Sequence, residues 1–243
     1  MTIEFRPPRP GEAPILRSLF TEAFGDEAFT NLFFDRGYSP ERCLVAAGDS
    51  VQAALHWFDC TLETRKCAYL YGIATFASCR GRGIGSELIR FAIPYLQSRG
   101  YAVITLVPAE PSLVDYYERF GFRTASTIGW ELIRAGQPIP LRPLSLAEYA
   151  AHRRKYLPAN GIVQEGACLD VLAGFAELYA TDHAVAAVSE SSILELLGDH
   201  ADAPGIFAAL GRPGGTVRFP GDRRPFAMAI GTDTPIYLGL ALD

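Results

Sequence analysis

The sequence predicts an α/β protein whose helices cover a mixed sheet, followed by a second, smaller α/β domain. Segments of helical and of strand periodicity alternate along the first half of the 243 residues. A glycine-rich stretch, residues 81–85, stands where a strand passes into a helix. A breaker-rich run, residues 136–140, then interrupts the pattern. These observations predict two domains, residues 1–137 and residues 138–243.

Composition narrows the class of protein. The net charge of −5 and the lack of long basic clusters argue against nucleic acid as a partner. No apolar run is long enough to cross a bilayer, and the first residues lack the regions of a signal peptide, so we expect a cytoplasmic protein without a membrane partner. The five cysteines are dispersed without metal-ligand spacing, so we expect reduced thiols and no metal.

The elements before the glycine-rich stretch follow from periodicity. Apolar residues at helical spacing, such as Leu16, Leu19 and Phe20, predict a helix over 11–24. A turn at Gly48-Asp49-Ser50 predicts a hairpin. The expected order is a strand at 2–7, helices at 11–24 and 27–35, and strands at 42–47, 51–62 and 66–76.

Residues 79–87, which we call the glycine-rich loop, have the layout of an anion cradle. Glycines let the backbone turn with its amides inward, and the helix that follows begins with N–H groups that lack acceptors. Arg80, Arg82 and the helix dipole add favourable charge for a polyphosphate. A Walker loop would need a lysine after Gly85, and a dinucleotide fingerprint would need glycine in place of Ser86, so both readings are disfavoured.

A second motif narrows the interpretation. After an apolar strand at 102–107 comes Tyr116-Tyr117-Glu118-Arg119-Phe120-Gly121-Phe122. The pattern Arg80-x-x-Gly83-x-Gly85 resembles the R/Q-x-x-G-x-G/A signature of the GCN5-related N-acetyltransferase (GNAT) superfamily, and the second motif resembles its fourth-helix signature Y-E-x-x-G-F. The resemblance implies the GNAT fold, acetyl-CoA as co-substrate, and acetyl transfer to a primary amine by direct attack in a ternary complex.

The resemblance also implies roles for individual residues. The fourth strand of the family diverges from the fifth, and its free backbone bonds the pantetheine arm, whereas the loop holds the pyrophosphate. A backbone amide of the fourth strand, here Thr75 or a neighbour, polarises the acetyl carbonyl, and Tyr117 protonates the leaving thiolate. The implied cofactor-binding residues are Ile73, Ala74, Thr75, Arg80, Gly81, Arg82, Gly83, Ile84, Gly85 and Ser86.

The general base is open at this point. His56, Asp59, Glu110 and Asp115 are acidic or imidazole candidates near the expected cleft, and a water chain is an alternative. We keep Glu110 as the candidate on the acceptor side. The resemblance to two-domain relatives, the enhanced-intracellular-survival acetyltransferases, adds the C-terminal Asp243 as a further candidate.

The second half predicts a degenerate, partial GNAT-like domain without cofactor. Residues 139–144 and the helix expected at 145–156 repeat the start of the chain, with an arginine-proline pair in register. Strand and helix segments are expected at 168–179, 184–189, 193–197, 204–210, 216–219, 226–230 and 237–242. Gly211-Arg212-Pro213-Gly214-Gly215 predicts a turn rather than a second cradle. This half would complete the acceptor cleft or mediate a homodimer.

Two functions remain in competition. The first is an acetyl-CoA-dependent N-acetyltransferase whose acceptor is a small-molecule or protein amine. The second is a non-catalytic acyl-CoA sensor, against which the tyrosine at 117 argues mildly, because binding alone needs no proton donor. The acyl chain preference is open in either case.

Overall fold

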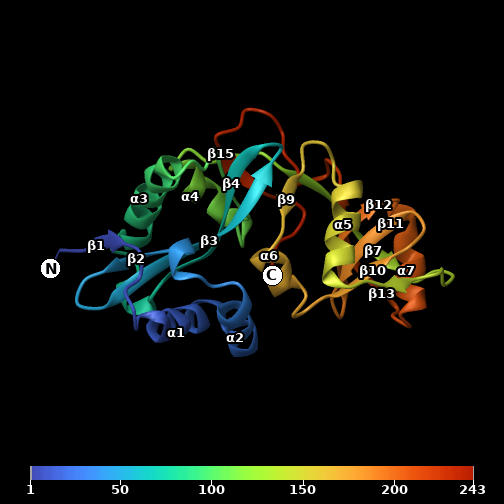
Figure 1. Ribbon diagram of the computed structural model, residues 1–243, viewed down its shortest axis with the longest axis horizontal. Helices are drawn as coiled ribbons and strands as arrows, with labels where there is room; N and C mark the ends of the chain where they lie inside the picture. Colours follow the sequence, from blue (N-terminus) through green and yellow to red (C-terminus); the bar gives the residue numbers. More distant parts are fainter. Residues whose placement is uncertain (1, 243) are drawn as a thin grey trace.

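The computed structural model describes residues 2–242 and shows two mixed sheets, each covered by helices (Figure 1). The elements of the first half are β1 (Glu4–Arg6), α1 (Ala13–Phe24), α2 (Glu27–Arg36), β2 (Cys43–Ala47), β3 (Val51–Leu62), β4 (Arg65–Thr75), α3 (Ile84–Ser98), β5 (Val103–Leu106), α4 (Val114–Glu118), β6 (Arg123–Thr124) and β7 (Thr127–Arg134). The expected order of helices and strands up to residue 107 is confirmed.

The second half adds a similar series of elements. They are β8 (Arg142–Pro143), α5 (Leu146–Tyr156), β9 (Ile162–Gln164), α6 (Ala167–Leu172), β10 (Glu177–Ala180), β11 (Ala184–Val188), β12 (Ser192–Gly198), α7 (Ala203–Ala209), β13 (Gly214–Pro220), β14 (Arg224–Pro225) and β15 (Met228–Ile230). Short 3-10 turns lie at Pro40–Arg42, Ala77–Cys79, Pro111–Leu113 and His200–Asp202. Among the helices within residues 2–242, none has the length and apolar character that crossing a bilayer requires.

The first sheet has the strand order β1-β2-β3-β4-β5-β15-β6, and β9 pairs with β3 beside this path. Neighbouring residues of its strands face opposite sides. Leu44 of β2 belongs to the same apolar cluster as Leu88 of α3, whereas the adjacent Val45 belongs to a different cluster that contains Phe20 of α1. Helices α3 and α4 therefore cover one face, and α1 and α2 cover the other, as Figure 1 shows.

The second sheet repeats this pattern strand for strand. Its order is β8-β10-β11-β12-β13-β7-β14, and its parallel pair is β12 with β13, joined through α7. The corresponding pair of the first sheet is β4 with β5, joined through α3. In both halves the first strand carries an arginine that pairs with a glutamate six positions on, Arg6 with Glu12 at 2.8 Å and Arg142 with Glu148 at 3.0 Å. The short sequence repeat thus reflects a repeated architecture.

The two halves exchange strands. The strand β15, from the end of the chain, lies between β5 and β6 in the first sheet. The strand β7, from the first half, pairs along seven residues with β13 in the second sheet. The division between the sheets therefore does not follow the boundary that we predicted at residue 137. The reason is hydrogen bonding, because β5 and β13 each pair with a strand from the other half of the chain.

The C-terminal segment, residues 236–242, runs through the seam between the halves. We expected regular secondary structure here, but its only ladder contact within the described chain is an isolated bridge from Tyr237 to Gly161. Side chains and loop backbone hold it instead. The Tyr71 hydroxyl donates to the Leu242 carbonyl at 2.5 Å, and the Leu238 amide donates to the Ser126 hydroxyl at 3.2 Å.

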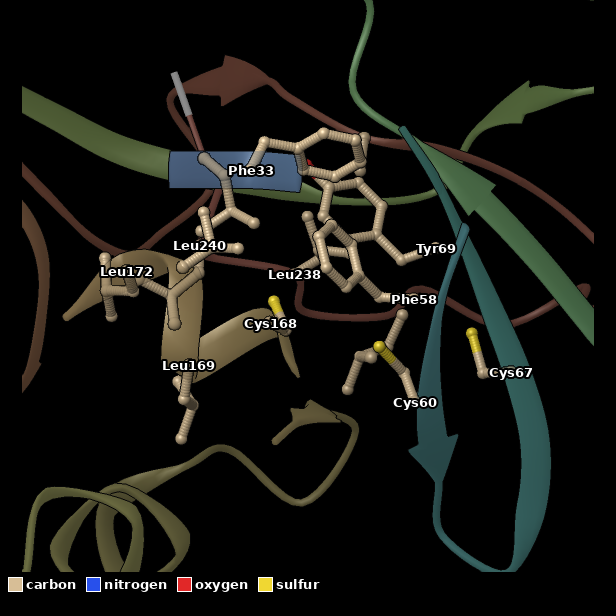
Figure 2. Close-up of a cluster of buried hydrophobic side chains, with 14 of the residues drawn as sticks. Phe33, Phe58, Cys60, Cys67, Tyr69, Cys168, Leu169, Leu172, Leu238 and Leu240 are labelled. Carbon is tan, nitrogen blue, oxygen red and sulfur yellow. The ribbon is translucent and has the colours of Figure 1, made fainter. Parts of the chain in front are cut away.

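A shared apolar core fills the same seam. In Figure 2, Phe33, Phe58 and Tyr69 of the first half lie beside Leu238 and Leu240, and α6 brings Cys168, Leu169 and Leu172 to the group. Cys60 and Cys67 are directly opposed on β3 and β4 and are free thiols. Burial raises the pKa of both thiols, so they act as small apolar side chains.

A buried ion pair joins the second half to this core. The Arg153 guanidinium donates to both carboxylate oxygens of Glu195, at 2.7 and 3.1 Å, and also to the Gln164 side chain at 3.2 Å. Gln164 in turn donates to the Leu240 carbonyl at 2.8 Å. Burial opposes the charge of Arg153, but the partnership with Glu195 outweighs it and the pKa of the guanidinium is raised.

We expect Glu195→Gln to lower the free energy of unfolding by about 3 to 5 kcal/mol, because it leaves a buried guanidinium without its counter-charge. Urea denaturation would measure this. Arg9→Gln is the matched control, since it breaks an ion pair with Glu4 in which both side chains are more than half exposed, and it should cost less than about 1 kcal/mol. Equal losses of unfolding free energy in the two variants would contradict the assignment of Arg153 and Glu195 as a buried ion pair.

Candidate functional site

The strands β4 and β5 separate after a short contact. They pair only at Cys67 with Val103, Ala68 with Ile104, and Tyr69 with Thr105, whereas β4 continues to Thr75. Within residues 2–242, the ladder between β4 and β5 therefore ends well before residues 73–75. An extended chain could bind beside these residues as a pseudo-strand.

A bulge bends β4 at this point. The register with β3 shifts between Ala54 and His56, and Gly72 has a φ of +59°. A β-carbon at Gly72 would lie 2.6 Å from the Phe20 ring, so glycine is required both for the turn and for the close approach of α1. Bulges bend a strand and increase its twist, which carries the end of β4 away from β5.

The glycine-rich loop follows β4 directly. Gly81 and Gly83 have φ values of +74° and +77°, and α3 begins at Ile84. The first bond of the helix runs from the Glu87 amide to the Gly83 carbonyl at 3.0 Å. The amides of residues 84–86 therefore have no acceptor within the helix and point out of its N-terminus.

Two contacts fix the entry to this loop. The Arg80 side chain donates to the Thr75 carbonyl at 3.0 Å, and the Ala77 amide donates to the Glu22 carboxylate at 2.6 Å. The second contact ties the loop to α1. No sequence pattern singled out Glu22, because it lies 55 positions from its partner.

The loop encloses a cavity of about 300 Å³, which we call the loop pocket. A β-carbon at Gly85 would lie 3.0 Å from Oγ1 of Thr75, so Gly85 keeps the space between α3 and β4 open. Arg82 is exposed and does not line the pocket, Ala74 is buried towards α1, and Ile73 packs on the α3 side. The lining residues are Thr75, Cys79, Arg80, Gly81, Gly83, Ile84, Gly85, Ser86 and Tyr116.

The two adjacent tyrosines of α4 lie in different surroundings. Tyr117 is 8% exposed and packs against Phe122, with ring centres 6.0 Å apart. Burial raises the pKa of its hydroxyl to about 12. Tyr116 instead lines the loop pocket, with its hydroxyl 3.2 Å from that of Ser86. Successive side chains on a helix point about 100° apart, so one of two adjacent tyrosines can line a pocket that the other does not. The tandem tyrosines were therefore the feature of the sequence that could have indicated a role for Tyr116.

Glu110 lines a second cavity, of about 580 Å³, between the two sheets. We call it the inter-sheet pocket. Val114 of α4 also lines it, so one short helix borders both cavities, with Val114 at this one and Tyr116 at the loop pocket. The lining residues are Val107, Pro108, Ala109, Glu110, Pro111, Val114, Thr124, Ile128, Trp130, Arg218, Arg224, Pro225, Phe226, Ala227 and Met228.

The other candidate bases lie elsewhere. Asp59 accepts a hydrogen bond from the Tyr101 hydroxyl and pairs with Arg42 at 3.4 Å. Asp115 is exposed on α4. His56 is 3% exposed within a group of aromatic rings from α1 and α2, and its Nδ1 has no hydrogen-bond partner among the described residues. Asp243 lies outside the described residues.

Comparison with known proteins identifies the family. The family model described as an acetyltransferase (GNAT) domain matches residues 4–125, which is half of the chain. This region contains β4, the glycine-rich loop and α4. The chain belongs to the GNAT acetyltransferase family.

Relatives agree with this assignment. An uncharacterised N-acetyltransferase of Methanocaldococcus jannaschii is 36% identical over 72 residues, which cover 28% of this chain and 32% of the relative. The match thus spans about a third of that curated protein. Crystal structures of GCN5-related N-acetyltransferases from Anabaena variabilis and Kribbella flavida share the fold, with TM-scores of 0.70 and 0.66 and identities of 13% and 15%.

These structural likenesses extend over both halves. Each covers 94% of this chain, and the chain covers 72% of the Anabaena protein and 70% of the Kribbella protein. The two-part α/β architecture predicted from the sequence is therefore confirmed. The second sheet also repeats the strand order of the first, although no glycine-rich loop follows β12.

The buried His56 predicts a pH dependence of stability. Burial lowers its pKa from about 6.5 to about 3, so between these values the unfolded chain binds a proton that the folded chain does not. The free energy of unfolding should therefore fall with falling pH, by about 1 kcal/mol per pH unit from this group.

Urea denaturation between pH 6 and 4 would test this. His56→Leu should flatten the slope by about that amount, whereas His183→Gln, at an exposed imidazole, should leave it unchanged. Identical slopes for wild type and His56→Leu would show that His56 is not held neutral.

Proposed function

We propose that the protein is an acetyl-CoA-dependent N-acetyltransferase that transfers acetyl to a primary amine by direct attack in a ternary complex. The observation that carries the proposal is the opening between β4 and β5, which leads directly into a helix N-terminus with free amides. A pantetheine arm needs the first feature, and a pyrophosphate needs the second.

The residues present suit such a ligand. Small side chains and positive φ values at Gly81 and Gly83 allow a close approach of backbone to phosphate, and Gly85 leaves room beside Thr75. Amides 84–86 would hold the pyrophosphate together with the dipole of the 15-residue helix α3. Residues 73–75 would offer the backbone groups that bond the pantetheine amides.

Acetyl-CoA supplies an acetyl group as a thioester. The acceptor nitrogen forms the new C–N bond as the C–S bond breaks, and the electron pair of that bond leaves with the sulfur. The Thr75 amide would polarise the carbonyl oxygen, and the Tyr117 hydroxyl would give its proton to the sulfur. Because burial raises the pKa of Tyr117 to about 12, this hydroxyl stays protonated at neutral pH.

The proton lost by the amine needs an acceptor. Glu110 lies in the exposed loop after β5 and lines the inter-sheet pocket next to Val114. Val114 is three residues before Tyr117 on α4, so the two share a helix face. We therefore assign Glu110 to the acceptor side, where its carboxylate would orient the ammonium group and take its proton directly or through water.

Release of free thiol from acetyl-CoA with a panel of amines tests this function, and calorimetry measures binding of acetyl-CoA separately. We expect both binding and turnover. Binding without turnover on any amine would favour a non-catalytic acyl-CoA sensor, and absence of binding would contradict both readings.

The tandem tyrosines provide a matched pair of variants. Tyr117→Phe keeps the ring and removes the proton, so kcat should fall by about 10²-fold or more with little change in the affinity for acetyl-CoA. Tyr116→Phe removes a hydroxyl that lines the loop pocket. It should weaken acetyl-CoA binding more than it lowers kcat. If Tyr116→Phe instead lowered kcat and Tyr117→Phe weakened acetyl-CoA binding, Tyr116 rather than Tyr117 would be assigned as the proton donor.

A further inference from the structure

We propose that the amine acceptor carries a carboxylate, which Arg224 binds at the far wall of the inter-sheet pocket. This inference rests on the proposed function and names the substrate class for the same site. The charged residues that line the pocket favour an anionic group. Arg218 and Arg224 lie among its lining residues with one carboxylate, Glu110, so the lining carries one excess positive charge.

The two guanidinium groups lie on β13 and β14, the strands that flank β7 in one wall. Arg218 of β13 is the register partner of Trp130 on β7, and Arg224 of β14 is the partner of Ile128 on the other side of β7. Residues 128 and 130 face the same side of their strand. The wall is therefore a sheet surface with an indole between two arginines.

Aromatic rings hold both guanidinium groups in place. The Arg224 guanidinium carbon lies 4.5 Å from the centre of the Trp130 ring, and that of Arg218 lies 5.5 Å from the centre of the Phe226 ring. A stacked guanidinium keeps its N–H edge available, and that planar edge suits a carboxylate. Arg218 has another interaction besides its contact with the Phe226 ring. We therefore assign the carboxylate of the acceptor to Arg224.

No acidic side chain neutralises Arg224 within residues 2–242, although its neighbour Arg223 pairs with Glu131. Glu131 lies between Trp130 and Leu132 on β7, so it faces the opposite side of the sheet. Two consecutive arginines thus point to opposite faces: one is paired with a carboxylate, and the other lies on an aromatic ring in a pocket.

The opposite wall sets the direction of the acceptor. Glu110 and Val114 lie there, and Tyr117 is on the same helix face as Val114. An acceptor with its ammonium group at Glu110 and its carboxylate at Arg224 would present the nitrogen near Tyr117. Apolar lining residues, among them Val107, Phe226 and Met228, would contact the part between the two charged groups.

Matched amines would test this in the full-length chain. L-Phenylalanine, its carboxamide and phenethylamine differ at the carboxylate, as do the corresponding derivatives of leucine and methionine. We expect kcat/KM at least about tenfold higher for the carboxylate-bearing member of each set, because a charge-assisted pair is lost in the other members. Phosphoethanolamine compared with ethanolamine tests phosphate as the anion.

Arg224→Gln should remove this preference by lowering kcat/KM for the carboxylate-bearing amine of each set to about that of its uncharged counterparts. Arg223→Gln is the control, since its side chain pairs with Glu131 on the other face, and it should retain the preference. Arg224→Glu should shift the preference towards the uncharged amines. Circular dichroism would verify that the variants fold.

Each result has a definite reading. Turnover without a preference, or a preference that survives Arg224→Gln, overturns this proposal and leaves the proposed function intact. A preference for the phosphorylated amine overturns the carboxylate assignment. Failure to acetylate any amine in the panel overturns the proposed function and this inference with it.

Discussion

The short parallel contact between β4 and β5 is the constraint on which the candidate site depends. Three residue pairs hold the strands together, and β4 continues to Thr75 beyond the end of that ladder. A longer contact would pair residues 73–75 with β5 within the sheet and close the opening. The bulge at Gly72 bends β4 at the point where the strands part, and the approach of Phe20 fixes the choice of glycine there.

The second half of the chain supports this opening. Strand β15 pairs with β5 on its other side, so the strand that diverges from β4 is held in place by the end of the chain. Strand β7 is exchanged into the second sheet. The end of the chain is linked to that sheet through Gln164, which donates to the Leu240 carbonyl and accepts from Arg153, the partner of Glu195 on β12. The inter-sheet pocket lies where these contributions meet, with lining residues from the loop after β5, from α4, β6 and β7, and from β13 to β15. Neither sheet alone would form it.

Local patterns account for what the sequence could predict. The glycine-rich loop, the helix after it and the hairpin at residues 48–50 depend on neighbouring residues, and all three lie where the periodicity placed them. The exchange of β7 and β15 could not be predicted in this way, because pairing partners about 100 positions apart leave no local pattern. The apolar composition of the C-terminal segment 236–242 predicted regular structure. The structure shows that the segment is apolar because it is buried in the seam. Tyr116 was missed because only tertiary packing decides which of two adjacent tyrosines lines a pocket.

Hydrogen exchange of backbone amides with and without acetyl-CoA would test whether the glycine-rich loop and β4 bind the coenzyme, because it reports on both residue by residue. We expect slower exchange on addition of acetyl-CoA for residues 81–86 and 73–75, with the distant strands of the second sheet unaffected. Unchanged exchange in both segments, or protection confined to other parts of the chain, would contradict the assignment of the glycine-rich loop as the coenzyme site.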